Sequence, residues 1–233
     1  MKRFYKEVET IAESDGWIVL LDGKSIKTPA WQTLLMPTIG MAEKVVREWE
    51  EQSDMIVPLS MPLTRYANAT IDRTRTMRDD VIEQICAFGQ SDMLCYRVAE
   101  PPDLVERQLA EWQPLLDWLS ASRDINLSVT AGIIQIDQPP STLERVNDVV
   151  SAFDDFQLTG LHAVTTVCGS IALGLALADG HIDCAETLEL ATLEERHQMG
   201  LWGEDPETMR RHDELRQEIF NANQFMTLAM PGA

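Results

Sequence analysis

A long uncharged run constrains the fold of this chain more than any other stretch of the sequence. Residues 156–178 read FQLTGLHAVTTVCGSIALGLALA and contain no Asp, Glu, Lys or Arg. Such a run is either a membrane span or a helix that its own protein encloses. Polar residues and glycines interrupt it and acidic residues flank it, which favours a buried helix without membrane insertion. Because a helix that is apolar on all sides must be covered by others, we expect a helical domain wrapped around it.

The first part of the chain has the pattern of strands and turns. Residues 17–21 and 24–28 are strand-like and flank Asp22-Gly23. This dipeptide supplies the positive φ angles that a two-residue hairpin turn needs, so the three segments predict a β-hairpin. Residues 33–36 predict a third, short strand.

The predicted fold class is α+β. Thr38 is expected to cap a helix after the predicted strands. We therefore expect a small, hairpin-rich N-terminal β domain with one helix over residues 1–58. A larger, all-helical C-terminal domain is expected over residues 59–233, built around a central helix at residues 156–178.

The charge of the chain is strongly negative and unevenly distributed. The net charge is −19, and residues 101–233 hold 7 Lys or Arg against 22 Asp or Glu. This balance argues against binding of nucleic acid, which requires phosphate neutralisation, and against docking on anionic lipid. The acidic second part is either a solvated surface that aids solubility or a face that attracts a basic partner.

The cysteines and the N-terminus bear on the compartment. Cys86, Cys95, Cys168 and Cys184 are far apart and form no Cys-x-x-Cys pair. They are typical of reduced thiols in an intracellular protein and form neither a disulfide framework nor a zinc site. No signal peptide or Arg/Ser-rich presequence pattern is evident, so we expect a cytoplasmic protein or an already processed one.

The sequence contains little that predicts catalysis. Phosphate-loop, dinucleotide-binding and nucleophile-elbow motifs are absent. Residues 194–197 contain one Glu-x-x-His, whereas di-metal carboxylate bundles use two copies on facing helices. A solvated helix face is the favoured interpretation, with no catalytic residue and no metal ligand. The alternative is a small metal-dependent hydrolase that uses Glu194, Glu195 and His197.

Two stretches are more specific than packing requires. In residues 61–73, Arg65, Asn68 and Asp72 form a polar stripe beside an apolar helix face. They are interpreted either as internal pairs at a domain seam or as residues that hold the two domains in a fixed relation.

The second stretch is residues 193–205, which includes the end of a helix predicted from Asp183 to about Leu201. Here Trp202 and Glu204 follow a run of acidic residues. Trp202 is interpreted either as a core residue under a solvated acidic turn or as the aromatic anchor of a recognition surface.

The chain resembles a known family at motifs that span nearly its whole length in the right order. These motifs are residues 2–7 (KRFYKE), 20–24 (LLDGK) with 28–29 (TP), 48–49 (EW), 61–65 (MPLTR), 92–96 (DMLCY), and 193–195 (LEE) with Gln198 and 202–203 (WG). The family they resemble is the ATP12 family, the assembly chaperones of the F1 sector of ATP synthase. The resemblance implies an N-terminal β domain and a C-terminal helical domain. It also implies a non-enzymatic protein that binds the free F1 α subunit until the β subunit replaces it, with no nucleotide or metal cofactor.

The resemblance also implies roles for particular residues. An acid that is important in the family falls on Glu194 or Glu195, and the sequence does not decide between them. A tryptophan important for folding or function falls on Trp49. Departures from the family pattern at residues 196–197 and 200–201 bear on the fine shape of the acidic surface.

The expected site residues fall into two groups. We expect partner contacts from Glu194, Glu195, Trp202 and Glu204, and supporting roles for Trp49, Arg65, Asn68 and Asp72. We expect a monomer in a bacterial cytoplasm, or in the mitochondrial matrix if the chain is a processed eukaryotic form.

Overall fold

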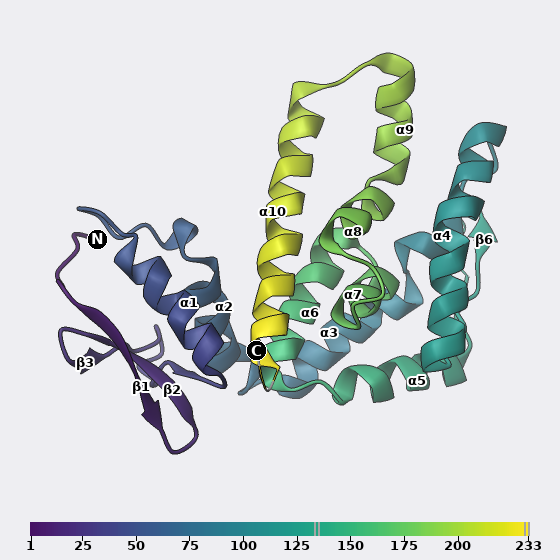
Figure 1. Ribbon diagram of the computed structural model, residues 1–233. Coiled ribbons are helices and arrows are strands. Elements are labelled where there is room, and N and C mark those ends of the chain that lie inside the picture. Colours follow the sequence, from purple (N-terminus) through teal and green to yellow (C-terminus); the bar gives the residue numbers. More distant parts are fainter. Residues whose placement is uncertain (133, 135, 231, 233) are drawn as a thin grey trace. The chain divides into compact units, whose positions relative to one another are not determined.

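The computed structural model describes residues 1–132, 134, 136–230 and 232 (Figure 1). The chain forms two compact units that are not contiguous in sequence. The first unit contains residues 1–78, 154–160 and 224–233, and the second contains residues 79–153 and 161–223. The predicted boundary near residue 58 therefore differs from the structure, because three separate segments of the chain build the first unit.

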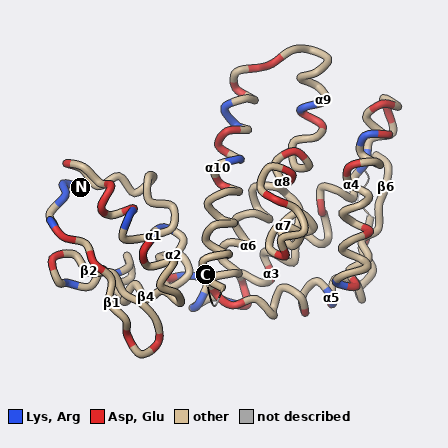
Figure 2. The backbone as a smooth tube through the Cα atoms, viewed as in Figure 1, with Lys and Arg blue, Asp and Glu red and all other residues tan. Residues whose placement is uncertain are grey.

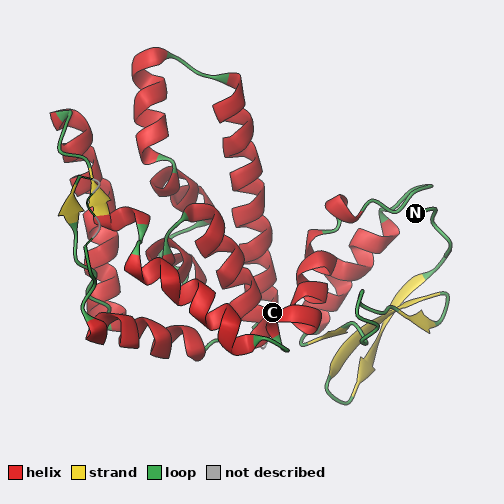
Figure 3. Cartoon of the chain, turned by 180° about the vertical axis from the view of Figure 1, so that it is seen from behind, coloured by secondary structure: helices red, strands yellow, loops and turns green. Residues whose placement is uncertain are grey.

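The fold agrees with the predicted α+β class, since most strands precede the first helix. Two short parallel strands also lie among the later helices, so the part of the chain expected to be all helical is not entirely helical (Figure 3). The strands are β1 (Val8–Glu13), β2 (Gly16–Leu21), β3 (Lys24–Ser25), β4 (Leu35–Met36), β5 (Tyr96–Arg97) and β6 (Thr130–Ala131). The helices are α1 (Ile39–Glu50), α2 (Pro62–Ala69), α3 (Arg78–Gln90), α4 (Pro102–Arg123), α5 (Pro140–Ser151), α6 (Asp155–Cys168), α7 (Ile171–Ala178), α8 (Cys184–Ala191), α9 (Leu193–Trp202) and α10 (Pro206–Ala229).

The predicted hairpin is confirmed in the first unit. Strands β2 and β3 pair antiparallel, with Leu21 opposite Lys24. Asp22 and Gly23 between them have φ angles of 48° and 75°, as a primed two-residue turn requires. Strands β1 and β4 also pair antiparallel with β2, so β2 is the central strand and contributes most of the buried sheet residues.

Helix α1 positions the helix that follows it in the first unit. The predicted cap is confirmed, since the Thr38 hydroxyl accepts a hydrogen bond from the Met41 amide at 3.2 Å. Glu48 of α1 is buried and accepts hydrogen bonds from the amides of Leu63 and Thr64 at 2.7 and 2.8 Å. A carboxylate at the N-terminus of a helix satisfies free amides and favours the helix dipole. Glu48 thus fixes the start of α2, the helix that carries Arg65 and Asn68.

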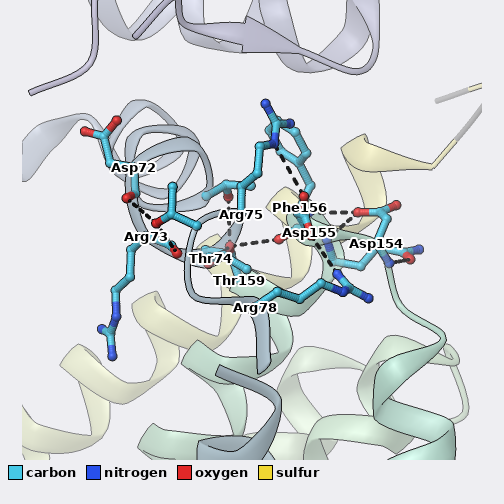
Figure 4. Close-up of polar contacts among 12 residues, drawn as sticks. Asp72, Arg73, Thr74, Arg75, Arg78, Asp154, Asp155, Phe156 and Thr159 are labelled. Atoms are coloured by element: carbon cyan, nitrogen blue, oxygen red, sulfur yellow. Dashed lines mark hydrogen bonds and ion pairs between the residues drawn. The ribbon is translucent and has the colours of Figure 1, made fainter. Parts of the chain in front are cut away.

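The start of α6 is attached to a π-helical turn, Thr70–Thr74, within the first unit (Figure 4). The Thr159 hydroxyl lies 2.8 Å from the hydroxyls of both Thr70 and Thr74. Asp155 forms an ion pair with Arg78 at 2.6 Å. These contacts explain how a segment far along the chain becomes part of the N-terminal unit.

The predicted central helix over residues 156–178 is two helices, α6 and α7. Gly169 has a φ of 65°, a conformation that ends a helix, and the Ser170 hydroxyl caps α7 by accepting from the Leu173 amide at 3.1 Å. The buried carboxylate of Asp92 fixes this break, since it accepts from the Ser170 hydroxyl at 2.9 Å and the Ala172 amide at 3.0 Å. Helix α7 is buried along its whole length except at its last residue. Among the described residues, none of the helices combines the length and the hydropathy of a membrane span.

Charge separates the two units sharply. The first unit contains 11 Lys or Arg and 13 Asp or Glu, for a net charge of −2, and the second contains 8 and 25, for a net charge of −17. Figure 2 shows acidic residues along the helices of the second unit, including α8, α9 and the first half of α10. The acidity predicted for the later part of the chain is thus a property of one folded unit.

Candidate functional site

Local capping signals set the bounds of the helices that carry the acidic stretch. Helix α8 begins with a capping box in which Asp183 and Glu186 bond each other's backbone amides. The helix predicted from Asp183 to about Leu201 is interrupted at Thr192, so Leu193 begins the separate helix α9. Gly203 ends α9 with a φ of 91°, and α9 and the first half of α10 then lie side by side (Figure 1).

Glu194 and Glu195 are neighbours in sequence with different partners. Glu194 accepts a hydrogen bond from the side-chain amide of Gln108 on α4 at 2.6 Å. Glu195 instead faces α10, where it forms an ion pair with Arg211 and lies 2.7 Å from the Nε2 atom of His212. Glu195 therefore joins α9 to α10, whereas Glu194 joins α9 to α4.

The two carboxyl groups have shifted pKa values of opposite direction. Burial raises the pKa of Glu194, and the charge of Glu195 adds to this effect against the hydrogen bond from Gln108. Burial also raises the pKa of Glu195, but the hydrogen bonds and charges of Arg211 and His212 outweigh it, so the pKa of Glu195 lies below its ordinary value. Glu195 is thus a fixed negative charge at neutral pH.

Trp202 lies on the surface at the end of α9. Its exposed fraction is 86%, so the interpretation of this residue as a core tryptophan is wrong. Together with Glu195 and Gly203 it lines a shallow pocket of about 180 Å³ between α9 and the start of α10. Glu204, two residues further along the chain, is also exposed. The four residues Glu194, Glu195, Trp202 and Glu204 are called the acidic surface below.

The residues of the hydrolase alternative do not face a common point. His197 lies 3.6 Å from a carboxylate oxygen of Asp103, beyond hydrogen-bond distance, while Glu194 and Glu195 bond other partners. Across the part of the chain that the structure describes, no cluster of three or more His, Cys, Asp or Glu has metal-binding geometry.

The predicted supporting residues all lie in the first unit. Asp72 accepts hydrogen bonds from the Thr28 hydroxyl at 2.5 Å and from the Ala30 amide at 2.9 Å. These bonds join the loop after β3 to the π-helical turn Thr70–Thr74 within the first unit, so Asp72 links residues on the two sides of the boundary predicted near residue 58. An ion pair between Arg65 and Asp72 is not formed, and Arg65 makes no ion pair with any described residue.

Trp49, Arg65 and Asn68 line one pocket of about 910 Å³ within the first unit. Trp49 packs edge to face on Tyr5, with ring centroids 5.6 Å apart. The exposed side chains of Phe4 and Trp31 also line this pocket. It is called the N-terminal pocket below, and no pattern in the sequence predicts it.

Sequence reasoning also missed His212. This histidine lies in a strongly charged stretch, yet it is 6% exposed and contacts Glu195. A signal was present, because His212 lies seven residues before the buried Ile219, a spacing that puts both on one face of a helix. For Trp31 no such signal existed, since it lies in a loop with no periodicity.

Comparisons with known proteins agree on one family. The profile described as ATP12 chaperone protein matches residues 2–120. The Schizosaccharomyces pombe protein named "Protein atp12, mitochondrial" is 24% identical over 214 residues, which cover 87% of this chain and 74% of that protein. The crystal structure of Atp12 from Paracoccus denitrificans is similar at a TM-score of 0.94 and 34% identity, with 98% of each chain covered. A single-residue mutant of P. denitrificans Atp12p has a TM-score of 0.95 at the same identity and coverage.

Proposed function

The chain belongs to the ATP12 family of chaperones for ATP synthase assembly, and from this membership we propose that it holds the free α subunit of the F1 sector. It keeps that subunit from aggregating until the β subunit takes its place. It works without catalysis, cofactor or metal, and as a monomer. The site of action is the bacterial cytoplasm, or the mitochondrial matrix for a processed eukaryotic form.

The physical need for such a holder is general. A subunit that awaits its partner exposes a large apolar interface, and exposed apolar patches of this kind aggregate. The holder must cover this surface with modest affinity, because a ligand of the folded client is displaced only when the true partner binds more tightly. Such a protein needs exposed anchors and complementary charge, with no need for converging catalytic groups.

The observation that carries the proposal is the exposed Trp202 beside the fixed charge of Glu195. An exposed tryptophan next to a shallow pocket is a typical anchor of a protein interface. The negative charge of Glu195 is held in place by Arg211 and His212, so little side-chain entropy is lost when a partner arginine binds it. The net charge of −17 on the second unit supports electrostatic attraction of a basic client face.

An aggregation assay with isolated F1 α subunit tests the proposal. We expect a stoichiometric amount of the protein to suppress light scattering of the α subunit after dilution from denaturant. Isolated β subunit is the control client and should aggregate as it does alone. Unchanged aggregation of the α subunit at an excess of the protein would reject the proposal.

The supporting assignments are tested in the same assay. We expect Trp202→Ala and Glu195→Gln to weaken suppression, while Glu111→Gln, a change on α4 in the same unit, leaves it unchanged. Metal analysis of the purified protein tests the proposal that it works without metal-dependent catalysis. Stoichiometric iron, manganese or zinc would favour the hydrolase alternative.

A further inference from the structure

The N-terminal pocket is large and apolar, and it lies in the unit that the acidic surface does not involve. Its volume of about 910 Å³ is at the upper end of the range for pockets that enclose a drug-sized ligand. Trp31 and Phe4, at its rim, are 82% and 64% exposed. Large aromatic side chains in this state lose little entropy when they are covered, and they anchor bound chains well.

The loop that carries Trp31 is built to hold that side chain outward. Trp31 has a φ of 62°, an unusual conformation for a residue with a bulky side chain. Asp72 stabilises this turn through its bonds to the Thr28 hydroxyl and the Ala30 amide, and the Gln32 amide donates to the same Thr28 hydroxyl at 3.1 Å. The surrounding structure thus maintains a strained residue whose side chain contributes to no core.

Two buried polar atoms on lining residues indicate what chemistry fits inside. The indole Nε1 of Trp49 and the side-chain oxygen Oδ1 of Asn68 are buried and have no hydrogen-bond partner among the described residues. The first atom only donates and the second only accepts. A peptide backbone offers one carbonyl acceptor and one amide donor per residue, so an extended chain carries the kinds of partner that both atoms lack.

The charge at the pocket distinguishes it from the rest of this acidic protein. Lys24, Lys27 and Arg65 line it, and Asp22 is the one acidic lining residue that the structure describes. The carboxylate of Asp22 is engaged by the amides of Lys6 and Glu7 at 3.0 and 2.9 Å. An occupant with a carboxylate next to its apolar side chains is therefore favoured over a basic one.

We propose that the N-terminal pocket binds an extended segment of the client polypeptide that pairs an apolar run with an adjacent Asp or Glu. Trp31 and Phe4 cover the apolar side chains, Trp49 and Asn68 bond the backbone, and Arg65 with the two lysines binds the carboxylate. The inference rests on the proposed function for the identity of the client. The N-terminal pocket is then a second binding site for the client. It binds a peptide segment, whereas the acidic surface binds a basic face of the folded client.

The test uses the full-length protein and fluorescent 15-residue peptides that tile the F1 α and β subunits. Binding is measured by fluorescence anisotropy for the wild type and for Trp31→Ala and Arg65→Glu. Two matched controls alter exposed residues of the same unit outside the pocket, Leu59→Ala and Arg47→Glu. We expect peptides with an apolar run and an adjacent acid to bind. Both pocket variants should weaken that binding at least about tenfold, and both controls should change it less than about twofold.

Three outcomes would overturn the inference. The first is that no peptide binds the wild type, and the second is that the pocket variants bind the peptides as well as the controls do. The third is that ATP binds the wild type and loses affinity in Trp31→Ala while peptides do not bind, which would make the pocket a nucleotide site. If peptides fail while aggregation of the α subunit is still suppressed, the pocket proposal fails and the proposed function stands. If peptides bind as expected while aggregation of the α subunit is not suppressed, the proposed function fails and the pocket proposal stands.

Discussion

The N-terminal pocket and the acidic surface differ in charge, shape and the origin of their rigidity. Lysines and an arginine line the pocket, in a unit of net charge −2, whereas the acidic surface belongs to a unit of net charge −17. The pocket is concave and apolar, with Trp31 at its rim. The acidic surface carries Trp202 beside a shallow depression only about a fifth of the pocket's volume.

One chain thus presents two surfaces suited to different kinds of partner. An ion pair and a histidine hold Glu195 in place on the acidic surface, so its charge is fixed before any partner binds. At the pocket, Trp31 has a strained backbone, and the buried polar atoms of the lining residues Trp49 and Asn68 have no hydrogen-bond partner among the described residues. The fixed charge of Glu195 favours the orientation of a folded client at the acidic surface. The N-terminal pocket, where the polar atoms of Trp49 and Asn68 lack partners among the described residues, favours the binding of a flexible segment.

The largest predicted effect is a loss of stability on substitution in the core of the first unit. Phe225 on α10 is fully buried in the first unit, with ring centroids 5.3 Å from Tyr66 and 5.7 Å from Phe156. Phe225→Ala should lower the free energy of unfolding by about 3–5 kcal/mol, because it leaves a cavity where three chain segments meet. Urea unfolding followed by circular dichroism measures this loss.

The control lies on the same helix. Phe220 is 50% exposed and belongs to the second unit, so Phe220→Ala should change stability by less than about 1 kcal/mol. Equal losses from the two substitutions would show that the C-terminal segment is not part of the core that supports the pocket.

The next effect concerns affinity for the client. Trp202→Ala should weaken suppression of α-subunit aggregation, with a loss of about 1–2 kcal/mol in binding free energy, as expected for an aromatic anchor. Because the side chain is 86% exposed, stability should stay within about 0.5 kcal/mol of the wild type. Titration of the client by light scattering gives the first quantity, and urea unfolding gives the second.

Phe220→Ala serves again as the control, since it removes another exposed aromatic ring of the second unit. If Trp202→Ala and Phe220→Ala have the same effect on the client, the acidic surface has no special anchor. The N-terminal pocket would then be the remaining candidate for recognition of the client.

Local sequence signals predicted much of this architecture, and long-range contacts account for most of what they missed. The Asp22-Gly23 turn and the Thr38 cap depend on residues within a few positions, and both are confirmed. The break at Gly169 depends on Asp92, a buried carboxylate far away in sequence. An apolar run with glycines fits one long helix or two short ones equally well without that partner.

The candidate site shows the same limit. The pattern of acids and an indole identified residues 193–205, but it left open whether Trp202 was buried. It also could not separate Glu194 from Glu195, because only the packing of α9 against α4 and α10 distinguishes their partners. No pattern in the sequence predicts the N-terminal pocket, because its walls combine strands, loops and two helices that are separate in the sequence.

A smaller effect follows from the opposite charges of the two regions. Raising the NaCl concentration from about 50 to about 500 mM shortens the Debye length from about 14 to about 4 Å. We expect the association rate with the α subunit to fall several-fold, because rim charges on the acidic surface steer the encounter. The dissociation rate should change less than about twofold, as stopped-flow fluorescence can measure.

The control is a peptide bound in the N-terminal pocket. Most of its contacts are apolar, so its affinity should fall less with salt than the association rate of the whole client does. An association rate that does not depend on salt would remove electrostatic steering from the account of the acidic surface.

The smallest effect distinguishes the two neighbouring carboxylates by pH. The pKa of Glu195 is lowered in the folded state, so its ion pair adds stability above about pH 4.5 and loses it as the pH falls through the folded pKa. The pKa of Glu194 is raised by burial, so its contribution is fully present below about pH 4.5 and is lost as the pH rises through the folded pKa. Both groups are partly exposed, so each effect should amount to about 1 kcal/mol or less.

Urea midpoints of Glu195→Gln and Glu194→Gln between pH 7 and pH 3 measure these contributions. Relative to the wild type, Glu195→Gln should be less stable at pH 7 and should approach the wild type in acid. For Glu194→Gln, the stability relative to the wild type should be highest at pH 7 and should decrease as the pH is lowered. If both differences move in the same direction with pH, the two side chains share one environment. Glu195 would then not be a fixed charge, and the acidic surface would not differ from the N-terminal pocket in this respect.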